Sequence, residues 1–330
     1  MKNCFRKLAA IALLALLAAS SHAQEESGII QLLKRVDKIL EEMQNDNDMD
    51  SSYVAVPEQK LAIRVSSDIS QGWIASRGIV DEDPVYMALK STTRYKERIN
   101  VGYRNLSVGI GFDPRFMLKK GVILGLNSYG NKFGYKVEYL HKTPFHGDLS
   151  YNSEIIDEEI DAMYSSFSVD LYYVLDRRFS MNAVYGLSYT QTRSAGSLFL
   201  TAAGITDKTQ LTELDGIGVD KITSSGIYFG LGLGYGYNLV MPHDWVLHVS
   251  LLPNILFVDR SKVSIETNSH SDSGYVPNFC ADVNIGLNHQ MGKWFAGMLC
   301  TFEEQRTGRS RYASTDYMTF RGKISLGRRF

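Results

Sequence analysis

Apolar and polar residues alternate along most of the chain from about residue 58 onward. Between 227 and 237, for example, large apolar side chains at every second position stand opposite a run of glycines. Comparable alternation recurs near 133–139, 165–173, 179–189, 279–287 and 318–326. Strands of soluble sheets are commonly about 5 to 6 residues long, whereas barrel strands that cross a membrane alternate over about 10. The pattern therefore predicts an all-β fold, a transmembrane antiparallel up-and-down β-barrel whose apolar face meets lipid.

About twelve strands account for the alternating segments, with ten or fourteen as alternatives. They are expected near 58–66, 93–102, 105–112, 121–128, 132–141, 162–175, 178–190, 223–239, 244–258, 277–290, 293–303 and 315–330. Every second connection between consecutive expected strands is short. The other connections are mostly long, and the longest is 191–222. Alternation of short periplasmic turns and long outside loops is expected of outer-membrane barrels. An even strand number then places both termini in the periplasm.

The first 23 residues predict a secretory signal peptide. Three basic residues within the first seven positions precede an apolar run from 8 to 19, and Ser21-His22-Ala23 offers small residues to a signal peptidase. That run is too short to cross a bilayer as a helix, and no later stretch is long and apolar enough to do so. The sequence therefore predicts an exported protein of a Gram-negative cell, with residues 58–330 as a barrel in the outer membrane.

Residues 24–57 predict a short periplasmic α-helix followed by a polar linker. Ile29, Leu33, Val36, Leu40 and Met43 recur at alternating steps of four and three, which places them on one helical face. Such a stripe favours an amphipathic helix that lies on a surface, and it also suits the docking of a periplasmic protein partner through residues 28–44.

Charge and cysteine usage exclude several classes of function. The chain has 35 Lys+Arg against 36 Asp+Glu, so nucleic acid is not an expected partner. Cys280 and Cys300 fall on opposite faces of neighbouring expected strands, so we predict no disulfide between them. Because CxxC and HExxH are missing from the sequence, neither a metal nor another cofactor is predicted.

Large aromatic residues follow the expected short turns. They predict a girdle at the periplasmic membrane interface, where such rings gather in barrels. Its members are Phe133, Phe179, Trp245, Trp294 and the terminal Phe330.

Charged residues on the opposite face of the strands predict the lining of the lumen. Closure of the barrel brings the last expected strand beside the first, so six cations share one wall: Arg64, Arg94, Lys96, Arg98, Arg321 and Lys323. Acidic partners are expected across the lumen at Glu138, Asp170 and Asp282. These charges suit an internal salt-bridge network, and they also suit a basic ladder that guides anions.

An enzyme of the lipid-modifying kind is not the expected function. His248 and Ser250 lie on one face of an expected strand, but their β-carbons are roughly 7 Å apart by strand geometry. This spacing predicts poor Ser–His contact, and a GxSxG motif is missing from the sequence. We therefore predict no catalytic residues.

The stretch from Arg94 to Phe112, RYKERINVGYRNLSVGIGF, resembles the first hairpin of an outer-membrane β-barrel family of Bacteroidota, the domain of unknown function 4421. The likeness extends over residues 53–330, through the paired hairpins to the terminal Phe330. It implies an outer-membrane barrel, and it brings no activity or functional residues with it.

Together these features predict a non-enzymatic outer-membrane barrel that acts as a narrow anion-preferring channel or small-solute porter. A second hypothesis is a structural or assembly barrel with a packed lumen, which docks a periplasmic partner through its helix. A lipid-modifying enzyme comes third. Expected contacts are outer-membrane lipid, lipopolysaccharide and, during insertion, the barrel assembly machinery.

Overall fold

The computed structural model describes residues 34–35, 37–38, 41–42, 49–80, 83–104, 106–112, 122–129, 132–151, 154–185, 187, 189–214, 219–265, 268–274, 278–307 and 313–330. The chain divides into two compact units, Met1–Asn47 and Asp48–Phe330. In the first unit the six described residues are helical and mostly exposed, as expected for the polar side of the predicted helix. The predicted signal peptide and apolar stripe lie outside the described residues.

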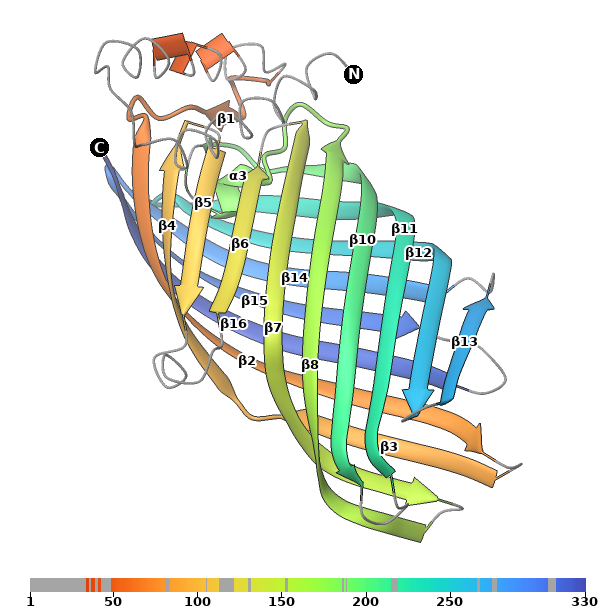
Figure 1. The fold of residues 1–330 in the computed structure, drawn as a ribbon. Helices are drawn as coiled ribbons and strands as arrows, with labels where there is room; N and C mark the ends of the chain where they lie inside the picture. The colour runs from red at the N-terminus through yellow and green to blue at the C-terminus, as the bar shows by residue number, and fades with distance from the viewer. Residues whose placement is uncertain are drawn as a thin grey trace, which may run out of the picture. The chain divides into compact units, whose positions relative to one another are not determined.

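Antiparallel strands make up almost all of the second unit (Figure 1). They are β1 (Val54–Ala55), β2 (Leu61–Val80), β3 (Asp83–Ser91), β4 (Arg94–Tyr103), β5 (Leu106–Phe112), β6 (Val122–Tyr129), β7 (Phe133–Tyr151), β8 (Glu154–Val174), β9 (Thr190–Gln191), β10 (Ala195–Leu214), β11 (Val219–Met241), β12 (Trp245–Ile265), β13 (Asn268–Gly274), β14 (Asn278–Met291), β15 (Trp294–Thr307) and β16 (Ala313–Arg329). The short helix α3 (Asn182–Tyr185) interrupts the strand order. Among the described residues, no helix combines the length and apolar character needed to cross a bilayer.

The sheet closes into a barrel because β16 pairs with β2 and β11 pairs with β12. β3 and β4 run one after the other along β2. β3 pairs directly with β7, whereas β5 and β6 are inserted between β4 and β7. Ten strands therefore surround the lumen at the level of β3, and the β5–β6 hairpin adds two at the level of β4. Figure 1 shows these two short strands beside the much longer β7 and β8.

Outward and inward side chains differ as the alternation predicts. On β11, Ile227, Leu231 and Leu233 are 48–59% exposed. On β2, the exposed Ile63, Val65 and Ile69 alternate with polar residues that are at most 5% exposed. The barrel thus presents an apolar belt outward and a polar lining to its lumen, and this is the arrangement expected of a barrel surrounded by lipid.

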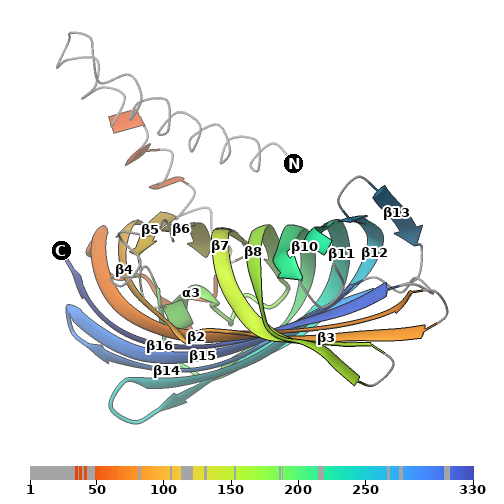
Figure 2. The ribbon, with the colours of Figure 1, turned by 60° about the horizontal axis from the view of Figure 1, so that its bottom comes forward.

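The predicted strand at 178–190 is wrong. This segment, together with its neighbours from 175 to 194, leaves the wall at the end of β8 and returns to it at β10. Conversely, Ala195–Leu214, predicted as part of the longest outside loop, is the twenty-residue strand β10. We call residues 175–194 the plug. Figures 1 and 2 both place its helix α3 inside the ring of strands.

Several strands also extend further than predicted. The acidic stretch expected as an outside loop, 154–161, belongs to β8. The strands that pair with β8 are similar to it in length, and β12 reaches Ile265. Polar strands therefore continue beyond the apolar belt at the end of the barrel opposite to the start of β2 and the end of β16.

Candidate functional site: the plugged lumen

The plug fills the end of the lumen at which β2 begins and β16 ends. Six of its apolar side chains are at most 5% exposed: Phe179, Met181, Ala183, Val184, Leu187 and Tyr189. They touch the wall on all sides, since Phe179 packs on Phe199 of β10 with 5.2 Å between ring centroids, and Leu187 packs with residues of β2 and β15. On β14, Asn288 donates a hydrogen bond to the Val184 carbonyl. The alternating apolar residues that predicted a strand here are buried because the segment is enclosed by the barrel.

A small set of hydrogen bonds ties the plug to the segment that follows the N-terminal unit. β1 and β9 form a two-stranded sheet, and the side chain of Gln191 lies at its centre. Gln191 Nε2 donates to the carbonyls of Tyr53 (3.3 Å), Arg178 (2.6 Å) and Arg193 (2.9 Å). Its Oε1 accepts from the Ser180 amide at 3.0 Å. We call this arrangement of β1, β9 and Gln191 the latch.

Below the plug, the six predicted cations share one wall of the lumen. The registers place Arg64, Arg94, Lys96, Arg98, Arg321 and Lys323 on the adjoining strands β4, β2 and β16. The four on β2 and β4 are 5–8% exposed. Asp68, on the same wall, pairs with Arg98 at 3.4 Å. Within the described part of the chain, Lys96 and Lys323 form neither a hydrogen bond nor a close ion pair.

Acidic residues face this wall and pair with it. Arg321 bridges Glu138 at 3.3 Å and Glu303 at 3.9 Å. Lys136 lies between the same two carboxylates, at 3.6 Å and 3.3 Å. Asp170 and Asp282 line the same cavity. We call these residues and the basic wall the ionic layer. The sequence analysis did not predict Glu303 as a member of this layer. It also did not predict Asp68, because the first strand was expected to end at 66.

An apolar cluster closes the lumen on the far side of the ionic layer. Tyr164 of β8 stacks on Tyr317 of β16, with 4.7 Å between ring centroids, although several strands separate β8 from β16 around the ring. Fully buried Phe145 of β7 contacts both rings. The cavities that remain hold about 90 Å³ between plug and ionic layer and about 100 Å³ between ionic layer and cluster.

A polar chain on β11, β12 and β14 connects the plug to the lumen wall. Contrary to the prediction of poor contact, His248 Nε2 lies 3.0 Å from Ser250 Oγ, because both side chains lean toward one another on the inner face of β12. His248 Nδ1 lies 2.7 Å from Asn238 Oδ1. The histidine and the serine are at most 1% exposed.

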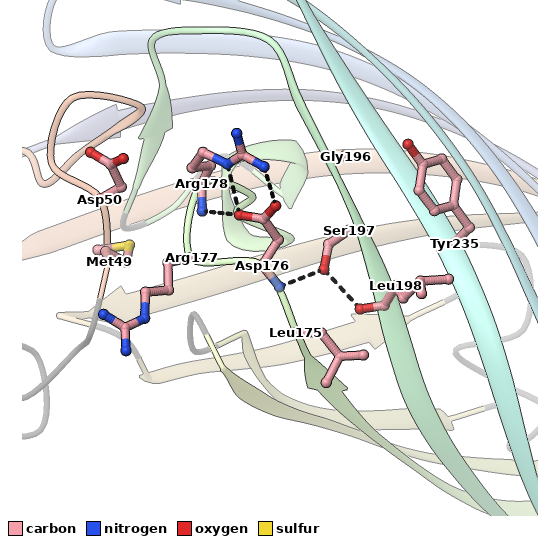
Figure 3. A pocket seen from close by; sticks show the side chains of 10 residues that line it. All are labelled: Met49, Asp50, Leu175, Asp176, Arg177, Arg178, Gly196, Ser197, Leu198 and Tyr235. Atoms are coloured by element: carbon pink, nitrogen blue, oxygen red, sulfur yellow. Dashed lines mark hydrogen bonds and ion pairs between the residues drawn. The ribbon is translucent and has the colours of Figure 1, made fainter.

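An open groove of about 810 Å³ lies at the outer rim of the plug (Figure 3). Two of its charged side chains are paired with each other: Arg178 binds Asp176 through two nitrogens, at 2.7 and 3.0 Å. The hydrogen bond from Arg178 lowers the pKa of Asp176, and the pairing raises the pKa of Arg178. The backbone N–H of Asp176 donates a hydrogen bond to Ser197 Oγ of β10 at 2.9 Å. The groove is therefore part of the attachment of the plug to β10.

Four of the predicted girdle residues start or end strands at the plug end of the barrel. Trp294 and Phe330 are 45% and 53% exposed, and Arg328 stacks over both rings at just over 5 Å. Trp245 is half-buried against the ring of His289, and Phe133 begins β7. Phe179 is not part of such a belt, because it is fully buried in the plug.

A family described as domain of unknown function (DUF4421) matches residues 48–330. The chain belongs to this family. The DUF4421 match begins where the second compact unit begins. The origin in Bacteroidota that the sequence resemblance implied stays a prediction.

Solved structures that resemble this DUF4421 barrel are outer-membrane proteins with different activities. The outer membrane protease OmpT from Escherichia coli aligns with 85% of this chain and 100% of its own, at 8% identity and a TM-score of 0.47. The translocator domain of the autotransporter NalP from Neisseria meningitidis covers 90% and 96%, at 10% identity and a TM-score of 0.37. The P. putida toluene transporter TodX covers 83% and 91%, at 9% identity and a TM-score of 0.25. No curated protein matches the chain by sequence.

Proposed function

We propose that the protein is an outer-membrane β-barrel whose lumen is closed at rest. The lumen is opened from the periplasmic side, and the open lumen admits small anions. The outward apolar belt and the predicted signal peptide support this location. The observation that carries the proposal is the latch, which joins the segment after the N-terminal unit to the plug. A periplasmic partner that engages residues 28–44 and draws on β1 would act directly on the plug.

The basic wall gives the opened lumen its preference for anions. Six cations lie on three adjoining strands, and the inner faces of these strands hold only one described carboxylate, Asp68. Lys96 and Lys323 are without a close counter-ion among the described residues. A low-dielectric channel lined on one side by cations concentrates anions and repels cations.

Opening requires two barriers to part, so the test uses two substitutions. Gln191→Leu weakens the latch, and Tyr164→Ala removes one ring of the stack that closes the far side. The refolded mature chain is inserted in planar bilayers, with a heat-modifiable gel shift to show that it has folded. We expect little conductance from the parent protein and steady anion-selective conductance from the double variant. Adding Lys96→Met and Arg98→Met to the double variant should reduce that selectivity; cation preference in the double variant would contradict the proposal.

A permanently sealed barrel that anchors a periplasmic partner is the second candidate. The ion pairs that link Arg321, Glu138, Glu303 and Lys136 across the lumen favour it, because such a network stiffens a barrel interior. A folded double variant that inserts without conducting would support this candidate against the first. Capture of a periplasmic protein that is lost on deletion of residues 28–44 would then identify the docking segment.

A further inference from the structure

Three side chains on β11 and β12 have the arrangement of a nucleophile, a base and an orienting group. Ser250 Oγ lies 3.0 Å from His248 Nε2, and His248 Nδ1 lies 2.7 Å from Asn238 Oδ1. Asn238 stands directly opposite His248 in the register of the two strands. Serine nucleophiles are activated by a base at this distance when a third group holds the base in place.

Hydrogen-bond partners fix the direction of proton donation along this chain. The Nδ2 of Asn238 donates to the Ser180 carbonyl at 2.9 Å and to Gln191 Oε1 at 3.1 Å, and both of these oxygens can only accept. While the plug is seated, Asn238 therefore turns its own carbonyl oxygen to His248, so Nδ1 of the imidazole carries the proton. In a neutral imidazole Nε2 is then the acceptor, and Ser250 Oγ donates to it. This is the tautomer that a general base for serine requires.

A fourth residue places an amide donor beside the serine. Asn284 Nδ2 donates to Ser250 Oγ at 3.3 Å. Its orientation is fixed because Thr301 Oγ1 donates to Asn284 Oδ1 at 2.9 Å. An amide N–H next to the nucleophile is a donor of the kind that stabilises the oxyanion formed during acyl transfer.

Apolar groups surround the serine and indicate the class of substrate. Phe199 and Ser250 lie together against Gly236, and Leu252 packs in the same cluster as Phe199 and Phe179. The cavity of about 90 Å³ beneath the plug is lined by Leu252, Asn284 and the plug residue Met181 on one side and by charged residues of the ionic layer on the other. When Phe179 and Met181 leave with the plug, the space that they vacate beside Phe199 and Leu252 gives the serine an apolar side, and the ionic layer forms the floor of the opened pocket.

From this geometry we infer that Ser250, His248 and Asn238 form a concealed acyl-transfer site for esters with an apolar acyl chain, which displacement of the plug exposes. Ser250 Oγ bonds to the ester carbonyl carbon and passes its proton to His248 Nε2. The bond from that carbon to the alcohol oxygen breaks, and the alcohol departs with the proton from His248. Water then attacks the acyl-serine in the same way, which releases the carboxylic acid and restores Ser250.

The site differs from the expectation of no catalytic residues because strand spacing alone left the two side chains too far apart. It depends on the proposed function only for access through the plug. The experiment therefore measures covalent labelling of the serine, which is independent of conductance.

The mature barrel, refolded and checked by its gel shift, is treated with an alkyl fluorophosphonate, and the modified residue is identified by mass spectrometry. The phosphorus bonds to the serine oxygen and fluoride leaves. We expect slow labelling of Ser250 in the parent protein and faster labelling in Gln191→Leu. Loss of the base in His248→Gln should slow labelling roughly 10²- to 10⁴-fold.

Matched variants separate chemistry from structure. Ser70 is a lumenal serine, 3% exposed, whose hydroxyl has no described partner, so Ser70→Ala should leave labelling of Ser250 unchanged. Asn238→Asp keeps an acceptor for the histidine and should retain labelling, whereas Asn238→Leu should lose it. Release of the plug in folded Gln191→Leu is checked separately by the accessibility of a thiol at position 183. If Ser250 is not labelled in a Gln191→Leu protein whose plug is released, the inference is overturned. Labelling without conductance would leave the inference standing and refute the channel.

Discussion

The latch predicts how firmly the plug is seated, and Gln191→Leu is the substitution that tests it. Gln191 is 2% exposed, and leucine fills most of its volume while removing every hydrogen bond of the amide. The Ser180 amide, fully buried, loses its partner, and the Arg178 carbonyl loses a bond of 2.6 Å. Buried groups left without a partner cost ~1–3 kcal/mol each. We expect a loss of about 3 kcal/mol in the free energy that seats the plug, or roughly a 10²-fold larger opening equilibrium constant.

A cysteine in the plug reports this equilibrium. The natural Cys280 and Cys300 are free and are first replaced by alanine. Ala183→Cys then places a thiol in the plug at a position that is 1% exposed. Its reaction with a membrane-impermeant maleimide proceeds through the opened plug, so in the limit of fast closing the rate follows the opening constant. Gln191→Leu should therefore accelerate the reaction roughly 10²-fold.

Gln305→Leu is the matched control. Gln305 is a lumenal glutamine, 8% exposed, whose Nε2 has no described hydrogen-bond partner. Replacing it changes side-chain volume and polarity in the same way without touching the latch, so the rate at position 183 should stay close to that of the parent. A folded Gln191→Leu protein whose thiol reacts no faster than this control would refute the reasoning.

Three further tests address other parts of the structure. Arg321→Met removes one of the two cations that pair with the buried Glu138 and Glu303, and Lys136 remains. The free energy of unfolding should fall by up to about 3–5 kcal/mol, and adding Glu138→Gln should restore part of this loss in urea titrations. Gly147→Ala places a β-carbon onto the backbone of β3 and should prevent the heat-modifiable gel shift, whereas Gly204→Ala, with only ordinary contacts, should retain it. The hydrogen bond from Arg178 lowers the pKa of Asp176. The Asp176 carboxylate therefore stabilises the fold above its ordinary pKa of 3.8, and this contribution is lost as the pH falls through the lowered pKa. In Asp176→Asn the urea midpoint should lack this part of the acid dependence.

The sequence predicted the barrel because lipid-facing strands carry a strong contrast between their two faces. On β11, bulky outward residues such as Leu231 and Leu233 alternate with glycines. The basic wall was also predictable, since the closing pair β2–β16 follows from strand order alone. Asp68 was missed because the first strand was expected to end at 66, and Glu303 because it is the last residue of its expected strand, 293–303.

The plug could not be predicted from the same contrast. Residues 179–189 alternate as regularly as any strand, but the alternation serves a segment packed inside the lumen. In β10 the contrast is weak, because small residues such as Ala202 lie outward while the bulky Phe199 lies inward. Which of the two segments joins the wall depends on tertiary packing. The contact between Ser250 and His248 was also missed, because the spacing of β-carbons along a strand does not show the direction in which the side chains point.

The plug is a connection between β8 and β10, so its place in the chain constrains the order of assembly. Its carbonyl at Leu187 accepts a hydrogen bond from Arg329 of the last strand at 3.3 Å, and the Leu187 side chain packs on Ala62 of β2 and Phe295 of β15. A seam between β2 and β16 that closes with the plug in position gains these contacts. A chain released with its plug outside would lack these contacts at the seam, so the final strand can distinguish a correctly filled barrel from an empty one at the moment of closure.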